Sequence, residues 1–149
     1  MAIIYGTENI DSLADTRSND VMHGAAGNDT LYGGYGNDLV FGDAGNDRLL
    51  GAQGNDTLIG GDGADTLIGG DGADTFTFDR ADGHDRIKDY QQGVDHLEFR
   101  GISGREIAWT AMEGGVIVRY GGLAGQAADH GEIFIAGITA LGYSDFIFS

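Results

Sequence analysis

Residues 24–77 read GAAGNDTLY-GGYGNDLVF-GDAGNDRLL-GAQGNDTLI-GGDGADTLI-GGDGADTFT, which are six nine-residue units in uninterrupted register. Every unit has Gly at positions one and four, Asp at position six and an apolar residue at position eight. Upstream, residues 6–14 and 15–23 keep the Asp and the apolar residue, but Asn9 and Ser18 replace the second glycine. Residues 1–77 therefore predict a solenoid domain, because a short fixed period is typical of stacked repeats.

Each unit combines a turn with a short strand. Glycines at positions one and four permit positive φ and close backbone approach, as tight turns require. Positions seven to nine, such as residues 57–59, predict a three-residue strand whose position-eight side chain faces inward. Two units complete one coil, so residues 18 apart stack at about the 4.8 Å spacing of neighbouring strands. We therefore predict an all-β fold, a right-handed parallel β-roll.

The stacking predicts two columns of position-six carboxylates. The columns are Asp29, Asp47 and Asp65, and Asp38, Asp56 and Asp74. Carboxylates this close repel one another when partly desolvated, and turn carbonyls that no strand ladder satisfies add further unpaired oxygens. Ca²⁺ between stacked turns resolves both problems, because it takes 6–8 oxygen ligands in irregular geometry. Mg²⁺ demands a stricter octahedron and Zn²⁺ prefers His and Cys, so we expect roughly four or more Ca²⁺ ions.

Carboxylates and backbone carbonyls are both expected as ligands. The two degenerate units add Asp11 and Asp20 to the position-six aspartates. Carbonyls from positions near one and three would complete the shell, and the spacing leaves open which of them take part. Position one is Gly24, Gly33, Gly42, Gly51, Gly60 and Gly69, and position three is Ala26, Tyr35, Ala44, Gln53, Asp62 and Asp71. At position two, Ala25, Asp43 and Ala52 replace Gly, a change that can alter the turn but leaves the aspartate in place.

Residues 78–149 lose the period and predict a C-terminal β cap. Short β-prone runs occupy 86–90, 96–99, 106–112, 116–120, 132–136 and 146–148. Alternating apolar residues on both sides of Glu113-Gly114-Gly115 indicate a hairpin. No segment has an apolar period of 3.6 residues, so we expect little helix. This region would cover the open end of the roll.

The composition excludes several classes of function. The 149 residues include 24 Asp and Glu against 8 Lys and Arg, a net charge of −16, so the basic surface that nucleic acid requires is missing. The chain has no Cys, which removes disulfides and thiolate metal sites. No apolar run reaches the ~18–20 residues of a membrane span. Neither H-E-x-x-H nor G-x-S-x-G is present, and we do not expect an enzyme.

The units GGYGNDLVF and GGDGADTLI resemble the RTX (repeats-in-toxin) nonapeptide, GGxGxDx(apolar)x. Residues 69–99 resemble the region after such repeats in serralysin-type proteases and alginate epimerase R-modules. The resemblance implies a Ca²⁺-binding parallel β-roll. It also implies export by a type I system that reads an uncleaved C-terminal signal, and residues 145–149, an acidic residue with an apolar triplet, look like that signal. Residues 1–13 lack the basic start and apolar stretch of an N-terminal signal peptide.

One further ligand set follows from the same resemblance. The segment D-R-I-K-D-Y is similar to the D-x-I-x-D-F of the family, which implies that Asp85 and Asp89 bind a further Ca²⁺ at the end of the roll. Asp95, in G-V-D-H, is a weaker candidate.

Together these features predict a secreted, extracellular module that folds on binding Ca²⁺. Each coil buries only two small apolar side chains, too few to offset backbone ordering and self-repulsion. Its partners would be Ca²⁺ and the type I secretion machinery. An alternative is a Ca²⁺-dependent module that binds a polysaccharide, and a third is a fragment of a larger enzyme or adhesin. Trp109, Tyr120 and Tyr90 are candidates for a sugar-stacking platform, although an interface between hairpin and roll is the favoured interpretation.

Overall fold

The structure is a computed structural model that describes residues 1–14, 17–80, 82–121 and 131–149, with Arg105 described by its backbone alone. Strands make up nearly all of the regular structure in these ranges, which confirms the predicted all-β fold. The strands of the roll are β1 (Ile3–Tyr5), β2 (Ser12–Ala14), β3 (Val21–His23), β4 (Thr30–Tyr35), β5 (Leu39–Ala44), β6 (Arg48–Gln53), β7 (Thr57–Asp62), β8 (Thr66–Asp71) and β9 (Thr75–Phe78). The later strands are β10 (His84–Ile87), β11 (His96–Phe99), β12 (Ala108–Met112), β13 (Gly115–Tyr120), β14 (Gly131–Ala136) and β15 (Phe146–Phe148).

Helical structure in the described ranges is limited to two short 3-10 segments, η1 (Gly104–Glu106) and η2 (Tyr143–Asp145). The prediction of little helix is therefore confirmed. Neither segment has the length and apolar character needed to cross a membrane.

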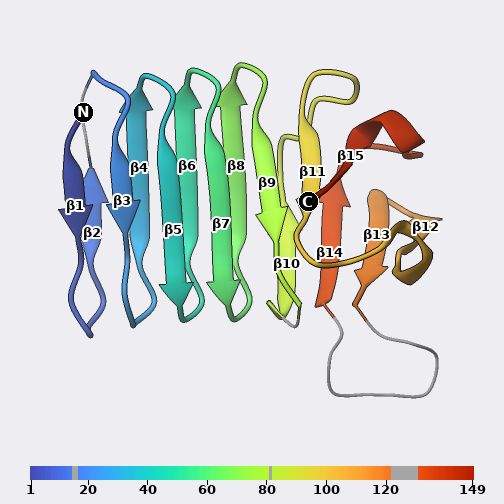
Figure 1. Cartoon of the computed structure of the whole chain (residues 1–149), viewed down its shortest axis with the longest axis horizontal. Coiled ribbons are helices and arrows are strands. Elements are labelled where there is room, and N and C mark those ends of the chain that lie inside the picture. Colours follow the sequence, from blue (N-terminus) through green and yellow to red (C-terminus); the bar gives the residue numbers. More distant parts are fainter. Residues whose placement is uncertain (15–16, 81, 122–130) are drawn as a thin grey trace.

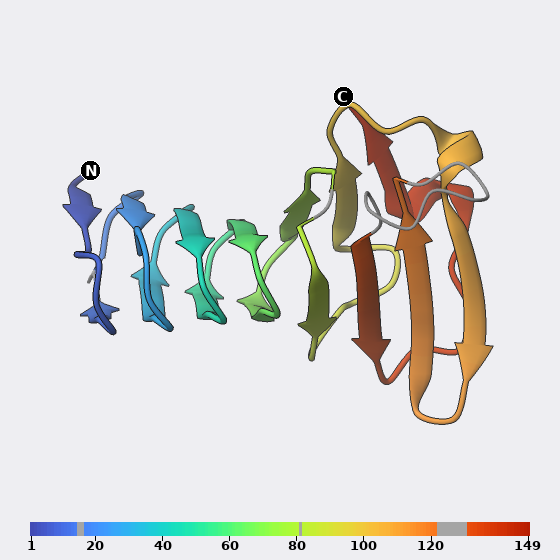
Figure 2. The same ribbon diagram turned by 90° about the horizontal axis from the view of Figure 1, so that it is seen from below.

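Consecutive strands of the roll alternate between two parallel sheets that wind together into a solenoid (Figure 1). Sheet A has the order β1-β3-β5-β7-β9-β11-β15, and sheet B has the order β2-β4-β6-β8-β10-β14-β13-β12. Residues 18 apart pair in register, as Thr30 does with Arg48 and Leu39 with Thr57. The predicted stacking of alternate units is confirmed. The view from below shows the coils following one another along the long axis, with the cap at the C-terminal end (Figure 2).

Position eight supplies the core of the roll, as predicted. Seven of its residues are completely buried: Met22, Leu31, Val40, Leu49, Leu58, Leu67 and Phe76. Ile87 and Leu97 continue these two rows into β10 and β11. The core is thus only two side chains wide in each coil, and its apolar burial per residue is small.

The strands of the complete units are longer than the sequence predicts. From β4 to β8 each strand has six residues, because pairing continues from positions seven to nine into positions one to three of the next unit. Tyr35 pairs with Gln53 in this extension, and Ala44 with Asp62. The prediction of three-residue strands is therefore wrong for these units, since the glycine at position one bends the strand without ending its ladder.

Both sheets continue beyond Thr77. Strand β11 pairs with β9 and β10 with β8, and β14 extends sheet B in parallel with β10. The β12–β13 hairpin then adds two antiparallel strands, so the predicted hairpin is confirmed. Tyr120 of β13 is 1% exposed and packs on Phe78 and Phe99, with ring centroids 5.8 and 5.1 Å away. Because Tyr90 is buried too, these two tyrosines belong to the core, in agreement with the favoured interpretation, and they cannot form a sugar platform with Trp109.

Candidate metal centre

The turns hold their shape through glycines at position four. These residues have φ between 124° and 145° from Gly36 to Gly63, a region that L side chains rarely adopt. A Cβ on Gly45 would also lie 1.6 Å from the carbonyl oxygen of Gly27, one coil earlier. Position four therefore requires glycine for two separate reasons, as the sequence predicted.

Glycine at position one serves a different purpose. Its φ is not positive, so the expectation of a left-handed residue there is wrong. A Cβ on Gly42 would lie 2.5 Å from Oδ2 of Asp47 and 2.4 Å from the carbonyl oxygen of Gly60 in the next coil. The missing side chain thus leaves a space on which one carboxylate oxygen and one carbonyl oxygen converge.

Position two has positive φ in every complete unit, whether or not the residue is glycine. Ala25, Asp43 and Ala52 have φ of 77°, 69° and 87°, and Gly61 has 95°. The substitutions leave the turn conformation unchanged, at the cost of some local strain. The Asp43 carboxylate accepts hydrogen bonds from the Ala25 amide (3.1 Å) and lies 3.2 Å from His23 Nδ1, so it has partners outside the turn.

The position-six aspartates form two columns, as predicted, and each column has five members. The first is Asp11, Asp29, Asp47, Asp65 and Asp85, and the second is Asp20, Asp38, Asp56, Asp74 and Asp95. In each column the backbone amide of one aspartate donates to Oδ1 of the next, over 2.7 to 3.0 Å. The steps are 18 residues within the repeats and lengthen to 20 at Asp85 and 21 at Asp95.

The second carboxylate oxygen has no hydrogen-bond partner in six of the column aspartates. Oδ2 is buried and unpaired in Asp29, Asp47, Asp56, Asp65, Asp74 and Asp85. These residues are at most 4% exposed. A buried oxygen of this kind is unfavourable unless a donor or a cation compensates it.

Burial makes five of these carboxylates bind protons more tightly. Desolvation, opposed by the backbone hydrogen bond and reinforced by neighbouring aspartates, raises the pKa of Asp47, Asp56 and Asp74 to about 6. The same causes raise the pKa of Asp65 to about 7 and that of Asp85 to about 8. Bound positive charge would therefore favour the ionised form, most of all at Asp65 and Asp85, whose pKa values lie at or above neutral pH.

Protein donors take the place of a cation at Asp11 and Asp95, two of the four column ends. Oδ2 of Asp11 accepts from the Thr7 amide (2.6 Å) and the Thr7 hydroxyl (2.9 Å). Oδ2 of Asp95 accepts from the Gln91 amide over 2.7 Å. At the start of the second column, Asp20 accepts from the Ala2 amide and lies 3.5 Å from the N-terminal amine. Asp85, the last member of the first column, has no such donor, so positive charge is required there as well as between the column ends.

Asp85 and Asp89, expected from the family resemblance to share one ion, have different charged neighbours. Asp85 is the last member of the first column, and Asp65 and Asp82 are its charged neighbours. Asp89 lies near Asp74 and Asp95 of the second column. Its two oxygens accept from the Gly69 amide (3.0 Å) and the Gly70 amide (2.9 Å), so its carboxylate already has protein partners.

The carbonyls of positions one and three are not equivalent. Position three accepts hydrogen bonds from position-four amides, as Gln53 does from Gly36 (2.9 Å) and Asp71 from Gly54 (2.9 Å). The expectation that no ladder satisfies these carbonyls is wrong at position three. At position one, the carbonyl oxygen points at the space beside the unpaired Oδ2 of the preceding coil, as between Gly60 and Asp47.

This donor set suits a hard dication. No three acidic, imidazole or thiol side chains converge within the described ranges, so a shell must draw on carbonyls as well as on column carboxylates. Carbonyl and carboxylate oxygens in irregular arrangement are the ligands of Ca²⁺. The column residues and the position-one carbonyls therefore fit calcium.

A ladder of asparagines at position five was not anticipated. The side chain of Asn28 accepts from the amide of Asn46, and Asn37 accepts from Asn55, each over 2.9 Å. The side chains of Asn46 and Asn55 accept in the same way from the amides of Ala64 and Ala73. At the start of the ladder, the side chain of Asn19 accepts from the amide of Asn37. These bonds hold neighbouring turns together on the exposed side of the columns. The signal was present in the sequence, because Asn recurs at this position in four of the six units.

Comparison with known proteins identifies the repeat. The family model for RTX calcium-binding nonapeptide repeats matches residues 5–40, 15–49, 23–58, 41–76 and 50–87. These matches together span more than half of the chain. No curated protein matches the sequence.

Solved structures share the fold. The AlgE6R3 subunit from the Azotobacter vinelandii mannuronan C5-epimerase superposes with a TM-score of 0.59 and 25% identity, over 97% of this chain and 81% of that one. The AlgE6R2 subunit of the same enzyme gives 0.51 and 24%, over 91% of each chain. The extracellular lipase LipA from Serratia marcescens gives 0.51 and 16%, over 99% of this chain but only 40% of the lipase.

Proposed function

This chain belongs to the family of RTX calcium-binding nonapeptide repeats, and on that premise we propose that it is a secreted module whose fold is conditional on Ca²⁺. The chain would leave the cell unfolded through a type I system and fold where calcium is abundant. The observation that supports this most is the set of buried, unpaired Oδ2 atoms inside the aspartate columns.

The residues that would hold calcium are the column aspartates whose second carboxylate oxygen is unpaired. Asp29, Asp47, Asp65 and Asp85 would supply carboxylate oxygens in the first column, and Asp56 and Asp74 in the second. Carbonyls of the position-one glycines would complete the shells, with those of position three as further donors. Bound Ca²⁺ supplies the positive charge that keeps the stacked carboxylates ionised. We propose four or more ions.

Folding would depend on calcium because little else stabilises the roll. Two buried side chains per coil do not offset the entropy of ordering about 18 residues. An ion that binds only the folded form contributes RT ln(1 + [L]/Kd), or about 2.7 kcal/mol per site at a hundredfold excess. Several such sites change the sign of the folding free energy.

The C-terminal residues suit a signal that is read only before folding. In the folded chain Asp145 is 2% exposed, and its carboxylate accepts from the Gly142 amide over 2.6 Å. Residues 146–148 form β15, which pairs with β11. An export apparatus would therefore reach this segment in the unfolded chain, before calcium closes the roll.

We also propose a binding role rather than a catalytic one for this chain. Its position-six carboxylates are engaged in the columns, and the chain lacks the hydrolase motifs named above. A second candidate function is calcium-dependent binding of a polysaccharide. The likeness to the AlgE6R3 subunit of an epimerase that acts on mannuronan favours this candidate. A glycan array in Ca²⁺ buffer tests it, since absence of binding to every polysaccharide would leave only the first function.

Calorimetric titration with Ca²⁺ of two matched variants tests the calcium sites. Asp56→Asn removes one column charge while keeping the side-chain shape, and we expect it to lower the number of bound ions by one or two. Asp43→Asn removes an equal charge from position two, outside the columns, and should leave the stoichiometry unchanged. Equal stoichiometry in both variants would contradict the assignment of calcium to the columns.

A further inference from the structure

The two sheets end in four edge strands, and one of them differs from the others. Strands β1, β2 and β15 have three residues each, whereas β12 has five. Its sequence, Ala-Trp-Thr-Ala-Met, carries no charge, and the chain contains no proline. Proteins protect sheet edges with short strands, charges or proline, and a longer uncharged edge is suited to pairing with another strand.

Strand β12 also extends beyond the layer that covers the rest of its sheet. Sheet B has eight strands and sheet A has seven, and β12 is the outermost strand at the cap end in both views (Figures 1 and 2). Trp109 and Ala111 pair with Val118 and Val116, which are completely buried. All five residues of β12 are nevertheless exposed. The apolar face of sheet B therefore extends beyond the part of sheet B that is covered.

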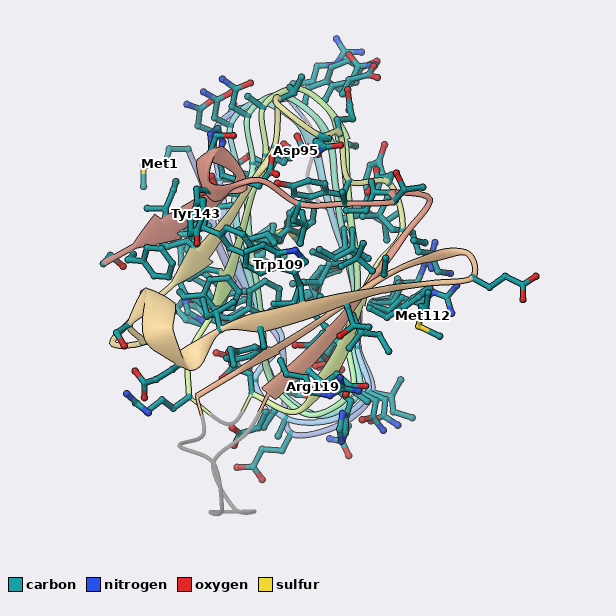
Figure 3. The ribbon with its side chains drawn as sticks, turned by 90° about the vertical axis from the view of Figure 1, so that its right-hand side faces the viewer. Met1, Asp95, Trp109, Met112, Arg119 and Tyr143 are labelled. Carbon is teal, nitrogen blue, oxygen red and sulfur yellow. The ribbon has the colours of Figure 1, made fainter. Side chains whose placement is uncertain are left out.

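Aromatic side chains collect beside this strand. Trp109 is 37% exposed, with its ring centroid 5.3 Å from Phe146 and 6.1 Å from Tyr143. Tyr143 is 86% exposed, and Figure 3 shows it close to Trp109 on the cap face. Met112, at the other end of β12, is 50% exposed. Large apolar groups gathered on one face of an acidic protein mark an interaction surface.

Charge distribution indicates what can approach this surface. Residues 1–99 carry a net charge of −14, and residues 100–149 carry −2. Two copies of the chain would repel each other along the roll but would meet at the cap almost without charge. Pairing at β12 would also place the two rolls on opposite sides of the contact, so that their acidic columns lie far apart.

We propose that β12 is a dimerisation edge at which β12 of a second copy pairs antiparallel about a two-fold axis. The end of sheet B is already antiparallel, so the second β12 continues its hydrogen-bond ladder. A two-fold axis makes the contact self-complementary and closed, with Trp109 of each copy covered by the other. This surface is distinct from the aspartate columns.

Sedimentation velocity of the full chain in excess Ca²⁺, over a range of concentrations, tests the dimer. We expect a mass that rises from 15.6 kDa to twice that value. The emission of Trp109, the single tryptophan, should shift to shorter wavelength over the same range. Thr110→Lys, which places a charge at the centre of the edge, should weaken association at least tenfold. Thr30→Lys, at an exposed threonine of the interior strand β4, should leave association unchanged.

Three results would overturn the proposal: a mass of 15.6 kDa at every concentration, association that Thr110→Lys leaves intact, or a series of species larger than a dimer. Circular dichroism in Ca²⁺ shows whether Thr110→Lys is folded. If that variant misfolds, a constant Trp109 emission in the unmodified chain is enough to reject the dimer. The outcome is separate from calcium-conditional folding, because all samples contain excess Ca²⁺.

Discussion

The backbone amide of Asp47 donates a 2.7 Å hydrogen bond to Oδ1 of Asp65, one coil further along, while Oδ2 of Asp65 stays buried without a partner. One oxygen thus fixes the stacking of the coils and the other is left for a cation. The same division recurs along both columns, so the interaction that sets the register of the roll also creates its demand for positive charge.

The capped column ends predict that aspartates at position six differ in their effect on calcium binding. We expect Asp47→Asn to raise the Ca²⁺ midpoint of folding at least fivefold, because it removes a carboxylate from between two coils. Asp11→Asn should change the midpoint less than twofold, since Thr7 already satisfies its second oxygen. Circular dichroism during a Ca²⁺ titration measures both midpoints. Equal shifts in the two variants would contradict the difference between column ends and interior.

The raised pKa values predict that acid favours the metal-free roll. A carboxyl whose pKa is 3.8 when unfolded and about 6 to 8 when folded binds its proton more tightly in the folded state. Its stabilising contribution is complete below pH 4 and is lost as the pH rises through 6 to 8. In chelator we expect more β structure by circular dichroism at pH 5 than at pH 8. A β signal that increases with pH would contradict this assignment.

Protons should also compete with calcium for the columns. As the pH falls from 8 to 5, the number of Ca²⁺ ions bound at a fixed free Ca²⁺ concentration should fall, because Asp65 and Asp85 must lose their protons to bind the ion. Calorimetric titrations at fixed pH values measure this dependence. A number of bound ions independent of pH would show that these carboxylates do not bind calcium.

Glycine at position one should be more important than glycine at position two. Gly42→Ala would place a methyl group where Oδ2 of Asp47 and the Gly60 carbonyl converge, and we expect it to cost roughly 3 kcal/mol in excess Ca²⁺. Gly34→Ala should cost about 1 kcal/mol, since alanine already adopts positive φ at this position in Ala25 and Ala52. Urea unfolding measures the free energy of unfolding of both variants. The reverse order would contradict the role of position one as the space for the ion.

The hydroxyl of Tyr120 should be unfavourable for folding. It is buried without a partner, so we expect Tyr120→Phe to raise the free energy of unfolding by roughly 1 kcal/mol. Tyr90→Phe is the matched control, because the Tyr90 hydroxyl donates to the Asp95 carbonyl over 2.9 Å and its loss should lower that free energy by about 1 kcal/mol. Urea unfolding measures both free energies. If the two variants change the free energy of unfolding in the same direction, the contrast between an unpartnered and a hydrogen-bonded hydroxyl would be contradicted.

The repeat determined most of what could be predicted. A period of nine with two units per coil places residues 18 apart in register, and this alone yields the position-eight core and the aspartate columns. The longer strands escaped prediction because glycine at position one suggests an interruption, whereas the backbone pairs through it. The capped ends could not be predicted, since Thr7 lies in a degenerate unit and Gln91 in a loop beyond the repeats.

Beyond Thr77 the register depends on insertions that the period does not describe. Asp85 and Asp95 join the columns after steps of 20 and 21 residues, which a period of nine does not predict. The exposed edge of β12 could not be predicted from the sequence either. Alternating apolar residues predict a hairpin, but which of its strands lies at the sheet edge is decided by tertiary packing.

Calcium-conditional folding is tested by the far-ultraviolet circular dichroism of the purified chain at pH 8, in chelator and in excess Ca²⁺. We predict a coil-like spectrum in chelator, a cooperative transition to a β spectrum as Ca²⁺ is added, and no transition with Mg²⁺ at the same concentration. A β-rich spectrum that chelator leaves unchanged would show that the buried carboxylates do not need calcium, and would contradict calcium-conditional folding.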